Sequence, residues 1–300
     1  GGFGVTFVTD LENVSELKET ILQVWGRRDW DPLTVRQARS LSSQQIRDWV
    51  REPEEFMKWR ARISAIESLS TTLDPEQPNR IGLDEVAEAM KKLSRYEPPV
   101  LFYDPGTKSL SFKPIPLKPI KLRQGFQLTF RLSSSQRAHA LWWMVTKGDP
   151  EVAMVVGELL GGGTGAKWFQ LLRGGDQIAY HAIAQLQWTP VGSELTLYAA
   201  VMPEDLKLAR QKAQRLLSNL GSGRVDGSEV ERAKRIAELK LKQISSDPVS
   251  LSKTMAVWLM SGRSLSDWEN LPERLRSLTE DELVAFCRSL PQATEVVAIP

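Results

Sequence analysis

The property of this 300-residue chain that most constrains its fold is an internal repeat, in which late segments resemble early ones at a fixed separation. Each matching pair is 195 residues apart and keeps apolar, charged or proline positions in register. The pairs are Val35–Leu41 with Val230–Ile236, Glu52–Pro53 with Asp247–Pro248, and Val100–Pro105 with Glu295–Pro300. Self-similarity at a long period indicates repeated structural units, so the sequence predicts one and a half copies of a single domain.

The repeat also predicts the domain boundaries. We expect residues 1–105 to be the C-terminal part of a first domain and residues 124–300 to be a complete second domain. Between them, residues 106–123 are rich in lysine and proline and lack apolar periodicity, which is typical of an extended linker. On this interpretation, the N-terminal part of the first copy is expected to lie outside the sequence.

Hydrophobic periodicity predicts strands and helices in both copies. Apolar residues recur every three or four positions over residues 12–25, as in an amphipathic helix, and Pro53 and Pro150 each stand where a helix is expected to begin. The predicted strands are residues 4–9, 99–103, 126–132, 138–146, 178–188, 194–200 and 296–300. We therefore expect an α+β fold with an antiparallel or mixed sheet and helices packed on one face.

Composition excludes several classes of function. The 39 basic and 37 acidic residues give a formal net charge of +2, without the basic excess that nucleic-acid binding needs. No apolar stretch approaches the roughly 18–20 residues of a membrane-spanning helix. Cys287 is the single cysteine, so an internal disulfide is impossible, and its apolar neighbours predict a buried position. The compartment stays open, with bacterial periplasm and cytoplasm both possible.

Several motifs of the second copy resemble a known family. Leu159–Gly163, Trp168–Arg173 and Ile178–Tyr180 resemble the second domain of the pitrilysin family of zinc peptidases, which includes insulin-degrading enzyme and mitochondrial processing peptidase. Ser246–Pro248 and Leu278–Glu282 resemble the end of that domain. The resemblance implies two homologous α/β sandwich domains of the processing-peptidase type, the first present only as its C-terminal half. It also implies a peptidase of two halves, each with two such domains, that close on a chamber holding peptide.

The same resemblance implies that the zinc chemistry lies outside this chain. The family holds zinc through two histidines and a glutamate on one helix and a distal glutamate, leaving one position for water. The histidines here, His139 and His181, lack a second histidine or a glutamate at that spacing. We therefore expect no metal or cofactor in this chain, no peptidase activity of the chain alone, and zinc on a partner or a missing N-terminal segment. His139 is expected to be structural, whereas His181 is either structural or part of a peptide cleft.

Arg173 and Tyr180 match the family's other catalytic contribution. In the family, an arginine and a tyrosine at this spacing reach from the facing domain to the scissile peptide bond, so these two are the predicted catalytic residues. A guanidinium and a phenol can both donate hydrogen bonds to a carbonyl oxygen as it gains negative charge. The alternative is that Arg173 pairs with a surface carboxylate and Tyr180 fills a strand face.

A glycine-rich run precedes this pair and resembles the glycine-rich loop of the noncatalytic subunit of mitochondrial processing peptidase. The predicted substrate-binding residues are therefore Gly161, Gly162, Gly163, Thr164 and Gly165, together with His181. The alternative is a helix terminator followed by a loop, because no Walker lysine or Rossmann strand accompanies the run. Trp168 and Trp188 flank these segments, and each either faces a peptide or packs in the core.

Three functions are compatible with these residues. We favour a noncatalytic component of a pitrilysin-family metallopeptidase, which contributes Arg173, Tyr180 and a peptide-binding surface to a zinc site on a catalytic partner subunit. The second is a fragment of a single-chain zinc peptidase whose metal motif lies outside this sequence. The third is a catalytically silent scaffold, like the core subunits of the respiratory cytochrome complex.

Overall fold

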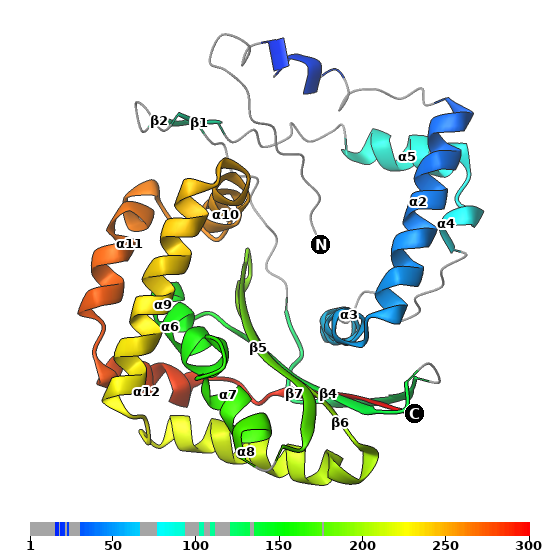
Figure 1. The fold of residues 1–300 in the computed structure, drawn as a ribbon. Coiled ribbons are helices and arrows are strands. Elements are labelled where there is room, and N and C mark those ends of the chain that lie inside the picture. The colour runs from blue at the N-terminus through cyan, green and yellow to red at the C-terminus, as the bar shows by residue number, and fades with distance from the viewer. Residues whose placement is uncertain are drawn as a thin grey trace. The chain divides into compact units, whose positions relative to one another are not determined.

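The computed structural model describes residues 16–17, 19–21, 23, 31–66, 77–93, 102–104, 109–111, 121–132, 135–175 and 177–300. The predicted strand at residues 4–9 and most of the predicted linker lie outside these ranges, although residues 109–111 of that linker form a strand. The predicted helix at 12–25 is described only at scattered helical residues. The described residues belong to two compact units (Figure 1).

One unit consists mainly of helices. It contains α2 (Pro32–Arg51), α4 (Gln77–Arg80), α5 (Leu83–Leu93) and the antiparallel pair β1 (Phe102–Asp104) and β2 (Ser109–Ser111). Asp31 caps α2, because its Oδ1 accepts hydrogen bonds from the N–H groups of Leu33 at 2.9 Å and Thr34 at 3.0 Å. Ser43 Oγ donates to Asn79 Oδ1 at 3.2 Å and so connects α2 with α4.

The other unit is built on a five-stranded mixed sheet with strand order β3-β7-β4-β6-β5. Its strands are β3 (Gln127–Arg131), β4 (Ala138–Thr146), β5 (Ala179–Thr189), β6 (Gly192–Val201) and β7 (Thr294–Ile299). β3 and β7 run parallel, and every other pair of neighbours is antiparallel. The prediction of an α+β fold with a mixed sheet is confirmed, and each strand expected within residues 124–300 is found.

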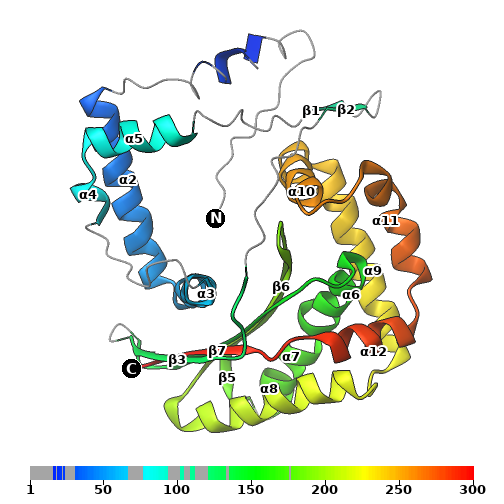
Figure 2. The same ribbon diagram turned by 180° about the vertical axis from the view of Figure 1, so that it is seen from behind.

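Helices cover both faces of this sheet (Figure 1 and Figure 2). On one side lie α6 (Pro150–Gly161), α7 (Lys167–Phe169), the π-helical turn η2 (Gln170–Gly175), the 3-10 turn η3 (Pro203–Asp205), α8 (Leu206–Gly221), α9 (Gly227–Ser246), α10 (Pro248–Met260), α11 (Leu265–Ser277) and α12 (Glu280–Ser289). On the opposite face, α3 (Pro53–Ala65) packs on β4 and β7. The helices of residues 124–300 thus lie on one face of the sheet, as expected of one repeat unit, and α3, which belongs to the first copy, covers the other face.

The reason lies in the apolar residues of α3. Met57, Ala61 and Ala65 are completely buried and belong to one core cluster with Leu141 and Trp143 of β4. Small and flexible side chains let the helix approach the pleated sheet closely, and burial of this stripe stabilises the contact.

Tryptophans fill much of the core on the other face. Trp142 and Trp168 meet edge to face with ring centroids 5.4 Å apart. Trp168 is fully buried and its Nε1–H donates to the backbone oxygen of Tyr198 at 2.8 Å, so it does not face a peptide. Trp188 packs with Trp258 and Trp268 in a second cluster, and its ring centroid lies 5.4 Å from that of Trp258 and 6.2 Å from that of Trp268.

The helix bounds reproduce the repeat. α2 and α9 are both 20 residues long, and α3 and α10 are both 13 residues long. Pro32 and Gly227 begin the first pair and Pro53 and Pro248 begin the second, and both separations equal the 195 residues of the sequence match. α3 nevertheless packs within the second unit. The domain boundaries at 105 and 124 stay predictions.

Candidate functional site

The fold brings the predicted catalytic pair together at the start of β5. The π-helical turn η2 carries Arg173, and β5 carries Tyr180 at a register shift between Ala179 and His181 in its pairing with β6. Arg173 Nη1 donates a hydrogen bond to the backbone oxygen of Tyr180 at 2.7 Å. A β-bulge redirects a side chain, so this irregularity and the arginine contact together set the position of Tyr180.

The Tyr180 side chain projects to the surface. It is 64% exposed, and its hydroxyl has no hydrogen-bond partner among the residues that the structure describes. The guanidinium carbon of Arg137 lies 3.8 Å from the centroid of the Tyr180 ring, a close cation–π contact. The guanidinium carbon of Arg173 lies 5.5 Å from the ring centroid of Phe169. The phenol is thus held by its ring while its oxygen remains available to a ligand.

The two histidines differ in environment. His139 is buried, with Nε2 2.7 Å from Ser135 Oγ and Nδ1 2.6 Å from Tyr198 Oη. Burial, and then the nearby charge of Arg137, lower the pKa of His139 to about 4, so its ring is neutral at pH 7. These contacts agree with a structural role. His181 is exposed beside Tyr180 and meets the Tyr198 ring edge to face at 5.8 Å, which leaves both of its predicted roles open.

The glycine-rich run ends α6 and begins a surface loop. A side chain at Gly161 would overlap the backbone oxygen of Ala184, so glycine here allows α6 to approach β5 closely. Gly163 has φ +88°, a backbone conformation that favours glycine. Gly163, Thr164 and Gly165 are exposed. The helix-terminator interpretation accounts for Gly161 and Gly163, and substrate binding by the loop stays a prediction.

The loop is anchored at two points. Arg232 Nη1 donates to the backbone oxygen of Gly162 at 3.2 Å, and Gln170 Nε2 donates to that of Thr164 at 2.6 Å. These bonds satisfy carbonyl groups at the end of α6, where no helical partner is available.

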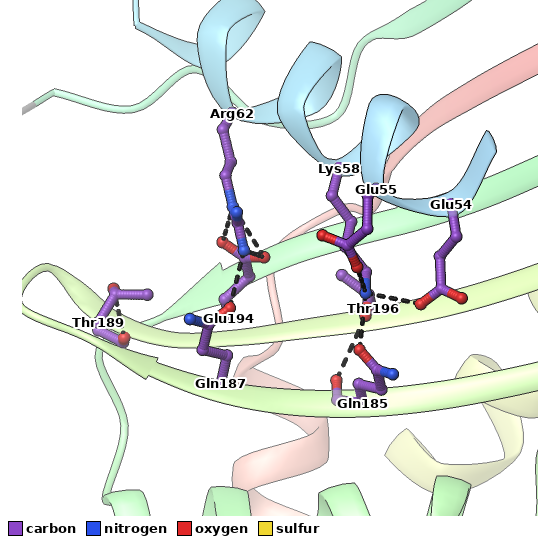
Figure 3. Close-up of polar contacts among 10 residues, drawn as sticks. Glu54, Glu55, Lys58, Arg62, Gln185, Gln187, Thr189, Glu194 and Thr196 are labelled. Atoms are coloured by element: carbon purple, nitrogen blue, oxygen red, sulfur yellow. Dashed lines mark hydrogen bonds and ion pairs between the residues drawn. The ribbon is translucent and has the colours of Figure 1, made fainter. Parts of the chain in front are cut away.

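A polar interface that no sequence motif indicated lies between α3 and the sheet (Figure 3). Arg62 donates through Nε and Nη2 to both carboxylate oxygens of Glu194 at 2.7–3.1 Å. Lys58 Nζ lies 2.6 Å from Glu54, 2.9 Å from Glu55 and 2.6 Å from Gln185 Oε1. A signal was present in β5, where Gln185 and Gln187 alternate with apolar residues and mark one polar face of the strand.

Neither histidine lies in a group of potential metal ligands among the described residues. Within the described ranges, no group of three histidine, cysteine, aspartate or glutamate residues is placed to hold a metal ion. The ring nitrogens of His139 are both engaged, with Ser135 and Tyr198. The residues present therefore do not fit the family's zinc site. In the same described part of the chain, no helix is long and apolar enough to cross a bilayer.

No protein-family model and no curated protein matches this sequence. Solved structures do. A protease from Helicobacter pylori aligns with a TM-score of 0.73 at 13% identity, over 97% of this chain and 78% of that one. A peptidase M16 inactive domain from Pseudomonas fluorescens aligns with a TM-score of 0.68 at 13% identity, over 97% of this chain and 76% of that one. A chain of complex III2 from Candida albicans aligns with a TM-score of 0.69 at 14% identity, over 97% and 78%.

Identities this low establish the fold and not the activity. The resemblance seen in the sequence motifs is confirmed at that level: this chain has the fold of the M16, or pitrilysin-type, peptidases.

Proposed function

We propose that this chain is a noncatalytic component of an M16-type peptidase that presents Tyr180 and Arg173 to a peptide held at a zinc site on another chain or segment. The observation that carries this proposal is the geometry of the pair. Arg173 holds the backbone of Tyr180 at the bulge, and the Tyr180 hydroxyl is exposed without a partner within the described ranges.

Tyr180 is the residue with the reactive donor. Its O–H can donate a hydrogen bond to the oxygen of a peptide carbonyl, and this bond strengthens as the oxygen gains negative charge. Arg173 uses Nη1 to fix the Tyr180 backbone, so it acts first as a positioning residue. Its remaining N–H groups can reach a ligand at the same surface.

The edge of the sheet supports binding of an extended peptide. β5 is the last strand in the order β3-β7-β4-β6-β5, so one of its edges has no strand partner in this sheet. Backbone groups on such an edge can pair with an added strand without selecting one sequence.

The test begins with the native protein purified from its source and every co-purifying chain identified. A companion chain with two histidines and a glutamate in the inverted zinc arrangement would supply the catalytic partner, whereas a longer single chain bearing that motif would place both parts in one enzyme. In either complex, Tyr180→Phe is expected to lower kcat by roughly a hundredfold, the loss typical of one such donor, with little change in KM. Arg235→Gln, at an exposed position on α9, is the matched surface control.

A scaffold role is the second candidate, and one observation favours it. Arg173 and Arg137 both use their guanidinium groups on Tyr180 itself, as purely structural residues would. If that is their whole role, Tyr180→Phe and Arg173→Ala leave turnover of the complex unchanged, and Arg173→Ala lowers only the melting temperature.

A further inference from the structure

We propose that Arg137 is a third residue of the Arg173–Tyr180 site and that this site holds an acidic segment of peptide. The inference rests on the proposed function only in taking peptide as the ligand. It adds a residue that no motif identified and a chemical class of substrate.

Arg137 reaches Tyr180 from a different part of the chain. It lies in the turn before β4, whereas Arg173 lies in the turn before β5. Its guanidinium carbon is 3.8 Å from the Tyr180 ring centroid, while Arg173 Nη1 is 2.7 Å from the Tyr180 backbone oxygen. Two cations therefore contact one exposed tyrosine, one through its ring and the other through its backbone.

The charges of these cations are not neutralised within the described ranges. Neither Arg137 nor Arg173 forms an ion pair there, whereas Arg62, Arg210, Arg274 and Arg276 all do. The carboxylates of Glu54 and Glu55, at the start of α3, are both bound by Lys58. Among the described residues, the site therefore presents two guanidinium groups whose charges have no carboxylate partner, and a planar guanidinium matches a carboxylate in geometry as well as charge.

The backbone at this site determines how a ligand would lie. Tyr180 and His181 stand at the start of the edge strand β5, so a peptide added along that edge passes beside Tyr180, the residue that both arginines contact. Alternate side chains of such a strand point to the same face. A glutamate or aspartate at one of those positions can meet a guanidinium, while a lysine or arginine there is repelled.

The test measures binding of three fluorescein-labelled decapeptides that differ only at a central pair of residues, Glu-Glu, Gln-Gln or Lys-Lys. Fluorescence anisotropy of the full chain is expected to rank them in that order, with a preference for Glu-Glu that weakens as salt is added. Arg137→Gln and Arg173→Gln should each reduce the preference for Glu-Glu over Gln-Gln by up to about fivefold, the contribution of one exposed ion pair. Arg137→Lys should retain part of the preference for Glu-Glu, because the positive charge remains. It should not retain all of it, because a lysine has no planar group to stack on the ring. Arg235→Gln, an equal charge change on α9, should have no effect, and circular dichroism establishes that each variant is folded.

Equal affinity for Glu-Glu and Gln-Gln in the unaltered chain would overturn the acidic assignment. The proposed function survives that result if binding of the Gln-Gln peptide still depends on Tyr180. Absence of binding by all three peptides would overturn the acidic-peptide proposal, whereas the proposed function is judged by the turnover of the complex with Tyr180→Phe. A single-stranded oligonucleotide of equal charge that binds as tightly, with the same loss in Arg137→Gln, would replace the peptide assignment with a general polyanion site.

Discussion

Replacing Arg62 with methionine tests whether the polar contacts of α3 determine its stability on the sheet. The Glu194 side chain is 4% exposed, and Arg62 is the residue that donates to both of its oxygens. Methionine keeps much of the apolar stem but leaves a buried carboxylate without its cation. Removing one partner of a buried pair typically costs about 3–5 kcal/mol. The Arg62 side chain is 39% exposed, so water can approach the vacated position, and we expect the lower end, about 3 kcal/mol.

Replacing the other partner, Glu194, is expected to lower the free energy of unfolding by a smaller amount. In Glu194→Gln, the guanidinium of Arg62 can turn toward solvent and retain its bond to Gln187 Oε1, which is 2.8 Å long. The double variant Arg62→Met with Glu194→Gln should recover part of the loss, because it buries no charge.

Urea unfolding of the four proteins measures these free energies, and a loss of about 3 kcal/mol corresponds to a melting temperature roughly 6–12 °C lower for a domain of this size. Two results would refute the reasoning. One is an Arg62→Met variant within about 1 kcal/mol of the unaltered chain, because a buried unpaired carboxylate cannot be that inexpensive. The other is equal cost for Arg62→Met and Glu194→Gln, because the argument depends on the difference in their burial.

Three further predictions concern single residues. The pKa of His139 is lowered to about 4, against 6.5 when unfolded, so the free energy of unfolding should fall as pH decreases from about 6.5 to about 4. In an NMR titration, the chemical shifts of the His139 ring protons should stay constant above pH 5. His139→Gln should remove this part of the pH dependence. Gly161→Ala places a methyl group on the Ala184 backbone oxygen and should destabilise the folded chain by about 1–3 kcal/mol. Gly163→Ala meets open space, so its only cost is that of the positive φ, about 1 kcal/mol. Thermal unfolding of the two variants checks this ranking. Burial raises the pKa of Cys287 to about 12, so iodoacetamide at pH 8 should label it only in denaturant, and rapid labelling of the native chain would contradict its burial.

Local features of the fold follow from the sequence because their causes are local. Alternating side chains identify β5 and β6, and Pro53 and Pro248 mark where helices begin. The repeat also matched α3 with α10 before any contact was known. Arg173 and Tyr180, which the family motif selects together, are in contact because they lie in adjoining elements and need only one turn to meet.

Contacts between distant segments do not have such signals. Arg137 stacks on Tyr180 because β4 and β5 both lie beside β6, a consequence of sheet order that no spacing rule contains. Pro53 predicts where α3 begins but not what the helix packs on, which is the face of the sheet formed by residues 141–145 and 296–298. The position of Trp168 next to a functional segment does not predict whether it is buried; in the fold it is fully buried and bonded to the Tyr198 backbone.

The position of β7 has a consequence for how this chain reaches its native state. β7 lies between β3 and β4, pairing Gln127 with Glu295 on one side and Trp142 with the same residue on the other. Every other strand of the sheet precedes it in the chain, so β3 has no strand to join until the segment around Glu295 has been synthesised. β5 and β6 can form an antiparallel hairpin earlier, and β4 can join that hairpin beside β6, through contacts that are closer in sequence. Closure of the sheet is therefore a late insertion, and the exposed edges of β3 and β4 are the surfaces at risk of pairing with other molecules while translation is incomplete.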